Sequence, residues 1–350
     1  MATDSPDTVA LTRFGWNADV ARAWERQRPL GARPARLTAV HRATVELEFG
    51  HGREAARVLP ALLGESFATG DWVAVEHDEM GALWVVARLE RRTELARATA
   101  SGARQLLAAN VDVLFVVMGL DGDWSPRRVD RYLALARQGG VEAVVVLTKA
   151  DLCEEAAARA AELERRLPPE TAIHAVDGRG RSAAAALARH LGPGRTAVLL
   201  GSSGAGKSTL ANTLLGAEVQ RTGAVREGDD TGKHTTTSRV LLALPDGACL
   251  IDTPGLRGLQ LSAGEEEVQE FFVDVSELAA RCHFRDCRHE SEPGCAVRGH
   301  VDSDRLDNLH KMQREAARLE EDAQARKERR GGDKAISKAL RAWVKQKRAT

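Results

Sequence analysis

A short glycine-rich segment in the middle of the chain has the residue types that bind phosphate. It follows an apolar run from Thr196 to Leu200 and precedes a helical pattern from Thr209 to Leu215. Glycines let several backbone N–H groups face one phosphate, and the start of a helix adds positive potential, so this context favours a P-loop over an ordinary glycine-rich turn. The residues expected to bind nucleotide here are Gly201, Ser202, Ser203, Gly204, Ala205, Gly206, Lys207, Ser208 and Thr209.

Two further segments predict the rest of a phosphate and magnesium site. Lys207 should reach the β- and γ-phosphates, and Ser208 should be a Mg²⁺ ligand. Asp252 ends a predicted strand and should hold Mg²⁺ through water, while Gly255 places a backbone N–H near the γ-phosphate. The polar stretch 228–238 lies between them and contains three consecutive threonines, of which Thr236 is expected to add a Mg²⁺ ligand when GTP is present. Such a loop would be a switch, and a plain surface loop is the alternative.

The segment from Thr148 to Asp151 resembles the guanine-recognition motif NKxD. In that motif the carboxylate, here Asp151, accepts two N–H groups of guanine, and the stem of the lysine, here Lys149, packs on the base. Adenine lacks that pair of donors, so this motif selects guanine. Thr148 stands where the motif usually has asparagine. In ordinary GTPases the motif follows the P-loop, whereas here it precedes it, which predicts a circularly permuted domain.

A cluster of cysteine and histidine predicts a structural zinc site. The pattern is Cys-x4-Cys-x-His-x5-Cys, and it places four soft or borderline ligands within fourteen residues: Cys282, Cys287, His289 and Cys295. Such a set suits closed tetrahedral Zn²⁺ with no open position for a catalytic water. A redox pair or unliganded thiols are the alternatives.

The pattern of predicted elements divides the chain into five parts. Five short β-like runs between 36 and 89 predict a small OB-type β-barrel. From Val111 to Ile251 apolar strands alternate with helices, which predicts an α/β domain with a doubly wound parallel sheet. Residues 96–110 between the two are interpreted as a basic connector. The expected divisions are an N-terminal segment and linker (1–34), the barrel (35–95), the permuted G domain (96–260), a small helical zinc domain (261–325) and a basic tail (326–350).

Composition and charge indicate the partners and the location to expect for the protein. The 350 residues carry no net charge, since 50 basic residues balance 50 acidic ones. The tail from Arg326 is different, because ten lysines and arginines against two acidic residues leave it at +8, which favours contact with a phosphate backbone. Neither an apolar run long enough to span a membrane nor a secretion signal is apparent, so a cytoplasmic protein without membrane contact is expected.

These motifs in this order resemble the ribosome-small-subunit-dependent GTPases, a family of circularly permuted GTPases. The resemblance covers about residues 11–320 and rests on the P-loop, residues 234–237, the segment Asp252–Gly255, the segment Thr148–Asp151 and the cysteine cluster. It implies an OB barrel, a permuted G domain and a C-terminal zinc domain. It also implies a monomer that binds the small ribosomal subunit and its rRNA, binds GTP and GDP, and couples GTP hydrolysis with Mg²⁺ to late subunit maturation and its own release.

One departure from ordinary GTPases bears on catalysis. Leu256 stands where they carry a water-positioning glutamine, so intrinsic hydrolysis should be slow. Our hypothesis is that His234, in the predicted switch, takes a catalytic role once the ribosome orders it, and a histidine without catalytic role is the alternative. Two other functions stay open: a GTP-binding RNA scaffold with negligible hydrolysis, and a P-loop kinase acting on a small molecule.

Overall fold

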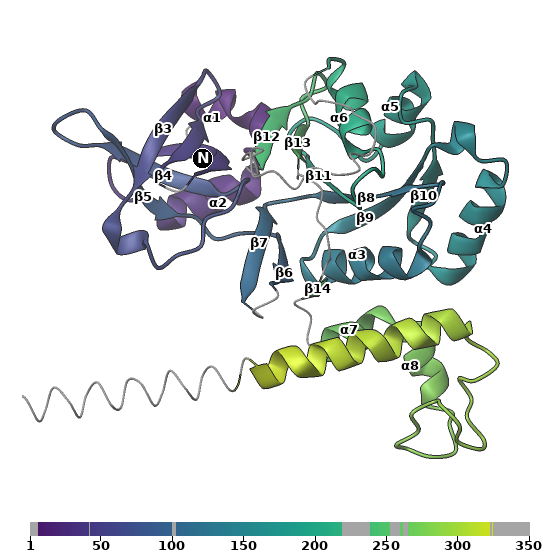
Figure 1. Cartoon of the computed structure of the whole chain (residues 1–350). Coiled ribbons are helices and arrows are strands. Elements are labelled where there is room, and N and C mark those ends of the chain that lie inside the picture. Colours follow the sequence, from purple (N-terminus) through teal and green to yellow (C-terminus); the bar gives the residue numbers. More distant parts are fainter. Residues whose placement is uncertain are drawn as a thin grey trace, which may run out of the picture. The chain divides into compact units, whose positions relative to one another are not determined.

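The computed structural model describes residues 6–41, 43–99, 103–218, 239–252, 260–261, 265–322 and 324. The chain forms two compact units, one of residues 1–97 and 105–259 and one of residues 98–104 and 260–350. Helices and strands of both units are labelled in Figure 1. His234, Thr236, Gly255 and the basic tail lie outside the described residues.

The first unit begins with a closed five-stranded barrel, which confirms the predicted one. The strands are β1 (Arg33–Val40), β2 (Val45–Glu48), β3 (Arg53–Val58), β4 (Trp72–His77) and β5 (Leu83–Arg88), in the order β1-β2-β3-β5-β4. A short 3-10 helix, η2 (Pro60–Leu62), follows β3. Alternate side chains such as Leu37, Leu47 and Val85 fill the interior, as the period of two in a half-buried strand requires.

Three tryptophans fasten the N-terminal segment to the barrel. That segment contains α1 (Pro6–Ala10), η1 (Thr12–Phe14) and α2 (Ala18–Gln27). The ring of Trp16 meets those of Trp24 and Trp72 edge to face, at centroid distances of 6.2 and 5.2 Å. All three are buried in one cluster. The N-terminal segment therefore packs on the barrel through these rings.

The stretch interpreted as a connector contains two strands. These are β6 (Glu94–Ala98) and β7 (Arg104–Ala109), which are neighbours in a small sheet. Leu95 and Leu107 are fully buried. The prediction was wrong because the buried positions of these two strands do not alternate along the chain, so the period of two that marks a half-buried strand is missing.

The central sheet of the first unit has six strands. They are β8 (Val113–Gly119), β9 (Glu142–Thr148), β10 (Ala172–Ala175), β11 (Thr196–Leu200), β12 (Val240–Ala243) and β13 (Cys249–Asp252), in the order β10-β9-β8-β11-β13-β12. Five strands run parallel, but β12 pairs antiparallel with β13. The expected parallel sheet therefore holds except at this edge, where a short turn makes a hairpin and no crossover helix can fit.

Helices cover both faces of this sheet. They are α3 (Pro126–Gln138), α4 (Ala156–Arg166), α5 (Arg181–Ala188) and α6 (Lys207–Leu215), with the 3-10 helix η3 (Ala150–Leu152) after β9. Figure 1 shows α5 and α6 on the opposite side of the sheet from α3. Leu187 of α5 and Leu210 of α6 share a buried cluster with Phe115 of β8. The carboxyl ends of β8, β9, β10 and β11 thus meet at one edge.

Backbone carbonyls of the G domain accept hydrogen bonds from the barrel. The Arg53 guanidinium donates to the carbonyl oxygen of Leu241 in β12 at 3.0 Å, and the Thr69 hydroxyl donates to that of Arg239 at 3.2 Å. Arg36, 1% exposed, donates to the carbonyl oxygen of Asn110 at 3.1 Å and to that of Phe14. These contacts make the barrel and the sheet one body.

The second unit is helical. It contains the short strand β14 (Gln260–Leu261), α7 (Glu265–Phe271), α8 (Val273–Ala279) and a long helix over 303–322. Arg305 of the long helix pairs with the Asp274 carboxylate through contacts of 3.0 and 2.8 Å and lies 4.7 Å from the ring centroid of Phe272. In the described parts of both units, no helix combines the length and apolar character needed to cross a membrane.

Candidate nucleotide-binding site and metal centre

The glycine-rich segment lies between β11 and α6, so the predicted order of strand, loop and helix is present. At two of its glycines, a side chain would clash with the backbone or strain it. A Cβ on Gly201 would stand 2.1 Å from the carbonyl oxygen of Val117, and Gly206 adopts φ +89°, a left-handed conformation that disfavours other residues. These close approaches form the tight curl that a phosphate-binding loop needs.

Lys207 begins α6 with its ammonium group folded into this loop. The Nζ atom donates to the carbonyl oxygen of Gly201 at 2.9 Å and to that of Ser202, and the residue is 7% exposed. Burial lowers the pKa of Lys207, and the carboxylate of Asp252 at the end of β13 opposes that effect. Burial likewise raises the pKa of Asp252. A ligand with several negative charges would stabilise the charged form of this buried lysine.

Thr148 joins the guanine-recognition motif to the P-loop. It ends β9, is 1% exposed, and its hydroxyl Oγ1 lies 2.6 Å from the carbonyl oxygen of Ala205. Next to it, Lys149 has φ +61°, a left-handed conformation that is uncommon outside glycine. Asp151 follows in η3 and is exposed. The two motifs are 50 residues apart in sequence but share one edge of the sheet.

The loop after β10 lies at the same edge of the sheet. The carbonyl oxygen of Val176 accepts the N–H of Ala150 at 3.3 Å, and that of Gly178 accepts the hydroxyl of Thr213 at 2.7 Å. The loop is therefore bonded both to the guanine-recognition segment and to α6. This position suits backbone contact with a base.

Two carboxylates at this edge were missed at the sequence level. Asp121 and Asp123 follow β8, and they contact Lys149 and the Ser202 hydroxyl respectively. The available signal was their place directly after a buried central strand, because ligands of open α/β sheets bind beyond the carboxyl ends of the strands.

The remaining predicted site residues divide into two groups. Ser208 and Thr209 lie in the first turn of α6, beside Lys207. His234, the threonines 235–237 and the segment 253–256 lie outside the described residues.

The predicted zinc ligands converge in the second unit. One ligand atom from each of Cys282, Cys287, His289 and Cys295 lies within 4.8 Å of the others. The Cys282 and Cys295 sulfurs are 4.0 Å apart, and the His289 Nδ1 atom is 3.6 Å from the first and 3.5 Å from the second. Zn–S bonds of about 2.3 Å and Zn–N bonds of about 2.0 Å in tetrahedral geometry require separations of this size. The donor set could hold one zinc ion.

Backbone N–H groups support this cluster. The N–H of Ala296 donates to the Cys282 sulfur at 3.3 Å, and that of Arg298 donates to the Cys295 sulfur at 3.4 Å. The carboxylate of Glu292 accepts three N–H groups of its own loop, those of Arg288, Glu290 and Ser291, at 2.9, 3.0 and 3.0 Å. These bonds, that of Arg288 first, lower the pKa of Glu292 to about 2. The carboxylate thus fixes the loop between His289 and Cys295.

Comparisons with known proteins show the family of this chain. The model of the RsgA GTPase family matches residues 88–262, the part of the chain that contains the P-loop and the guanine-recognition motif. A curated relative from Xylella fastidiosa (strain M23), named small ribosomal subunit biogenesis GTPase RsgA, is 48% identical over 297 residues, which are 81% of this chain and 88% of the relative. A relative of the same name from Xanthomonas axonopodis pv. citri is 44% identical over 91% of both chains. This chain belongs to the RsgA GTPase family.

Solved structures show the same fold. The crystal structure of YjeQ from Thermotoga maritima superposes with a TM-score of 0.61 at 25% identity and covers 82% of this chain and 99% of that one. YloQ, described as a circularly permuted GTPase, superposes with a TM-score of 0.57 at 20% identity, covering 82% and 96%. The permutation inferred from the order of motifs is thereby confirmed for this RsgA family member.

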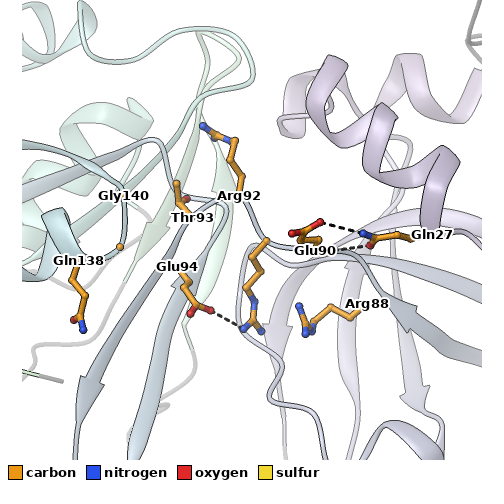
Figure 2. A pocket seen from close by; sticks show the side chains of 10 residues that line it. Gln27, Arg88, Glu90, Arg92, Thr93, Glu94, Gln138 and Gly140 are labelled. Carbon is orange, nitrogen blue, oxygen red and sulfur yellow. Dashed lines mark hydrogen bonds and ion pairs between the residues drawn. The ribbon is translucent and has the colours of Figure 1, made fainter. Parts of the chain in front are cut away.

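A separate cavity of about 750 Å³ borders residues 89–93, the linker that leads from β5 of the barrel to β6. Figure 2 shows Glu90 bonded to Gln27 and Glu94 bonded to a neighbouring arginine. That arginine, Arg91, also makes a bidentate pair with buried Asp71, at 2.7 and 2.9 Å. Two carboxylates, those of Asp71 and Glu94, thus balance the charge of Arg91. In this RsgA family member the cavity lies beside the contacts that join the linker to the barrel.

Proposed function

We propose that this protein is a GTPase that binds the small ribosomal subunit and couples GTP hydrolysis to a late step of subunit assembly and to its own release. The observation that supports the nucleotide part is the hydrogen bond from Thr148 to Ala205, because it joins the segment expected to recognise the base to the segment expected to bind phosphate. The names of the curated relatives support the ribosomal part.

The P-loop residues Gly201–Thr209 would bind the phosphates of GTP or GDP through backbone N–H groups, with the charge of Lys207 beside them. Asp151 would select guanine and the Lys149 stem would cover the base. Ser208, Asp252 and Thr236 would hold Mg²⁺, which when bound neutralises charge on the phosphates. Gly255 would sense the γ-phosphate.

His234 is proposed to act in catalysis because Leu256 cannot orient a water molecule. Single-turnover hydrolysis by His234→Ala with small subunits present tests this role. A large loss of the stimulated rate with intact GTP binding is expected, and an unchanged rate would show that His234 has no catalytic part.

The other parts of the chain are proposed to serve binding. One structural Zn²⁺ on Cys282, Cys287, His289 and Cys295 would hold the small helical unit together. The barrel and the basic tail would contact rRNA through their arginines and lysines. We propose a cytoplasmic monomer.

The decisive experiment measures GTP hydrolysis with and without purified small ribosomal subunits, with ATP as competitor and Lys207→Ala as control. Stimulation that is lost in the variant and unaffected by ATP is the expected result. Leu256 favours one other function, a GTP-binding RNA scaffold. Tight GTP binding without stimulated hydrolysis would select it, and competition by ATP would instead select a kinase.

A further inference from the structure

The segment 120–124, between β8 and α3, touches both arms of the nucleotide site. Its Asp121 carboxylate forms an ion pair with the Lys149 ammonium, and its Asp123 carboxylate accepts a hydrogen bond from the Ser202 hydroxyl. Lys149 belongs to the guanine-recognition motif and Ser202 to the P-loop. Nothing in the proposed chemistry of GTP hydrolysis uses either carboxylate.

Contacts to both carboxylate oxygens hold the Asp121 side chain in place. Its Oδ1 atom accepts the N–H of Asp123 at 3.2 Å, while its Oδ2 atom pairs with Lys149. A Cβ on Gly119 would stand 2.5 Å from Asp121 Oδ1, so the glycine leaves room for this carboxylate in its observed position. Burial disfavours its charged form, but the hydrogen bond and charge of Lys149 and the backbone N–H of Asp123 together outweigh burial and hold the pKa of Asp121 below its ordinary value. The lysine is therefore bound to an ionised, fixed partner.

The Asp123 side chain is the middle of a chain of contacts. Arg128 of α3 pairs with Asp123 Oδ1 and also donates to the Asp123 carbonyl oxygen at 3.3 Å. Asp123 Oδ2 accepts from Ser202, and the carbonyl oxygen of Ser202 accepts from Lys207. Arg128 balances the negative charge, which would otherwise repel a phosphate in the adjacent loop.

We infer that Asp121 and Asp123 are positioning residues for guanine nucleotide: Asp121 fixes Lys149 beside the base, and Asp123 fixes Ser202 and with it the P-loop. This inference rests on the proposed nucleotide site. A lysine side chain has many rotamers, so holding it in advance removes an entropic cost of binding. Loss of either carboxylate should weaken binding of both GTP and GDP and leave the chemical step unchanged.

The test measures the dissociation constant and release rate of a fluorescent GDP analogue on the full chain. We expect about tenfold weaker binding and faster release for Asp121→Ala and Asp123→Ala, as for loss of a charge-assisted contact that orders a binding group. Asp123→Asn keeps an acceptor for Ser202 and should bind near the wild-type level. Asp19→Asn removes an exposed carboxylate that pairs with Arg22 of its own helix, and it serves as the matched control.

Two further measurements separate positioning from a general effect on folding. Asp121→Ala should add no loss in a Lys149→Ala background, and Asp123→Ala should add none in a Ser202→Ala background, because each carboxylate acts through its partner. In GTP hydrolysis the variants should raise KM with kcat unchanged. If binding stays within twofold of the wild type, if the double variants lose additively, or if kcat alone falls, the inference is wrong. A wild-type protein that binds no guanine nucleotide would instead overturn the proposed function.

Discussion

The hydroxyl of Thr148 lies 2.6 Å from the carbonyl oxygen of Ala205, and this one bond connects two segments that bind opposite ends of a nucleotide in the proposed site. The sequence comparison with the NKxD motif treats threonine as a departure from asparagine. In the structure the threonine hydroxyl donates to the P-loop. The small side chain also fits beside Gly206, where an added Cβ atom would stand 3.1 Å from Thr148 Oγ1. Threonine therefore meets a structural need at this position.

Replacing Thr148 by valine should weaken guanine nucleotide binding. The change keeps the shape but leaves the buried carbonyl of Ala205 without this donor, at a cost of about 1–3 kcal/mol, so affinity for GDP should fall about tenfold. Thr148→Ser, which retains the hydroxyl, is the matched control and should bind nearly as the wild type does. Calorimetric titration with GDP measures both. Equal affinity for the valine variant would show that the bond does not organise the site.

The motifs found in the sequence have their residues close together in the chain, whereas the contacts of the segment 120–124 join residues far apart. The P-loop was predictable because its glycines and Lys207 have fixed spacing between a strand and a helix, so the local context carries the signal. The convergence of Cys282, Cys287, His289 and Cys295 was predictable for the same reason. Asp121 and Asp123 could not be assigned, because their partners lie 28 and 79 residues away and only the pairing of β8 with β9 and β11 brings them together.

Replacing Cys282 by serine should abolish metal binding and loosen the second unit. Three remaining ligands cannot close a tetrahedral structural site, and the free energy of metal binding stabilises such small units directly. We expect metal content to fall from about one equivalent to near zero by mass spectrometry, with faster hydrogen exchange over 303–322. Cys153→Ser, in the first unit, should change neither quantity. Glu292→Gln should keep the metal but release it to a chelator about tenfold faster, since groups that orient ligands contribute that much.

Replacing Arg91 by methionine should destabilise the first unit. The pair with Asp71 has side-chain exposures of 11% and 0%, so the variant leaves a buried carboxylate without its main partner, at about 3–5 kcal/mol. Urea unfolding followed by tryptophan fluorescence reports the change, because Trp16, Trp24 and Trp72 lie in this unit. Arg22→Met removes an exposed pair and should cost less than about 1 kcal/mol. A similar cost for both variants would contradict this account of the linker.

His174 should make the first unit less stable in mild acid. Its Nε2 atom lies 2.9 Å from the Arg189 guanidinium, which can only donate, and 3.1 Å from the Nε2 atom of His190, so protonation of His174 would place a second positive charge beside that arginine. Burial, then the charge of Arg189, lowers the pKa of His174 below 6.5. The unfolded state therefore binds more protons, and stability present above about pH 6.5 is lost as pH falls through the lower folded pKa.

Thermal unfolding between pH 7.5 and 5 measures this effect. We expect a smaller fall in melting temperature for His174→Gln than for the wild type. The control His77→Gln changes an exposed histidine at the end of β4 and should follow the wild-type curve. Parallel curves for all three proteins would show that His174 does not titrate differently on folding.

Replacing Thr69 by valine should uncouple the barrel from the strand that follows the predicted switch. The Thr69 hydroxyl donates to the carbonyl oxygen of Arg239, directly before β12, and Arg53 donates to that of Leu241 within it. If ribosomal contact on the barrel acts on hydrolysis through β12, Thr69→Val should lower the stimulation by small subunits several-fold, consistent with a lost bond of about 1 kcal/mol, and leave the basal rate unchanged. Thr69→Ser keeps the donor and should retain full stimulation. An unchanged ratio of stimulated to basal rate in the valine variant would mean that the ribosome acts on the site by another path.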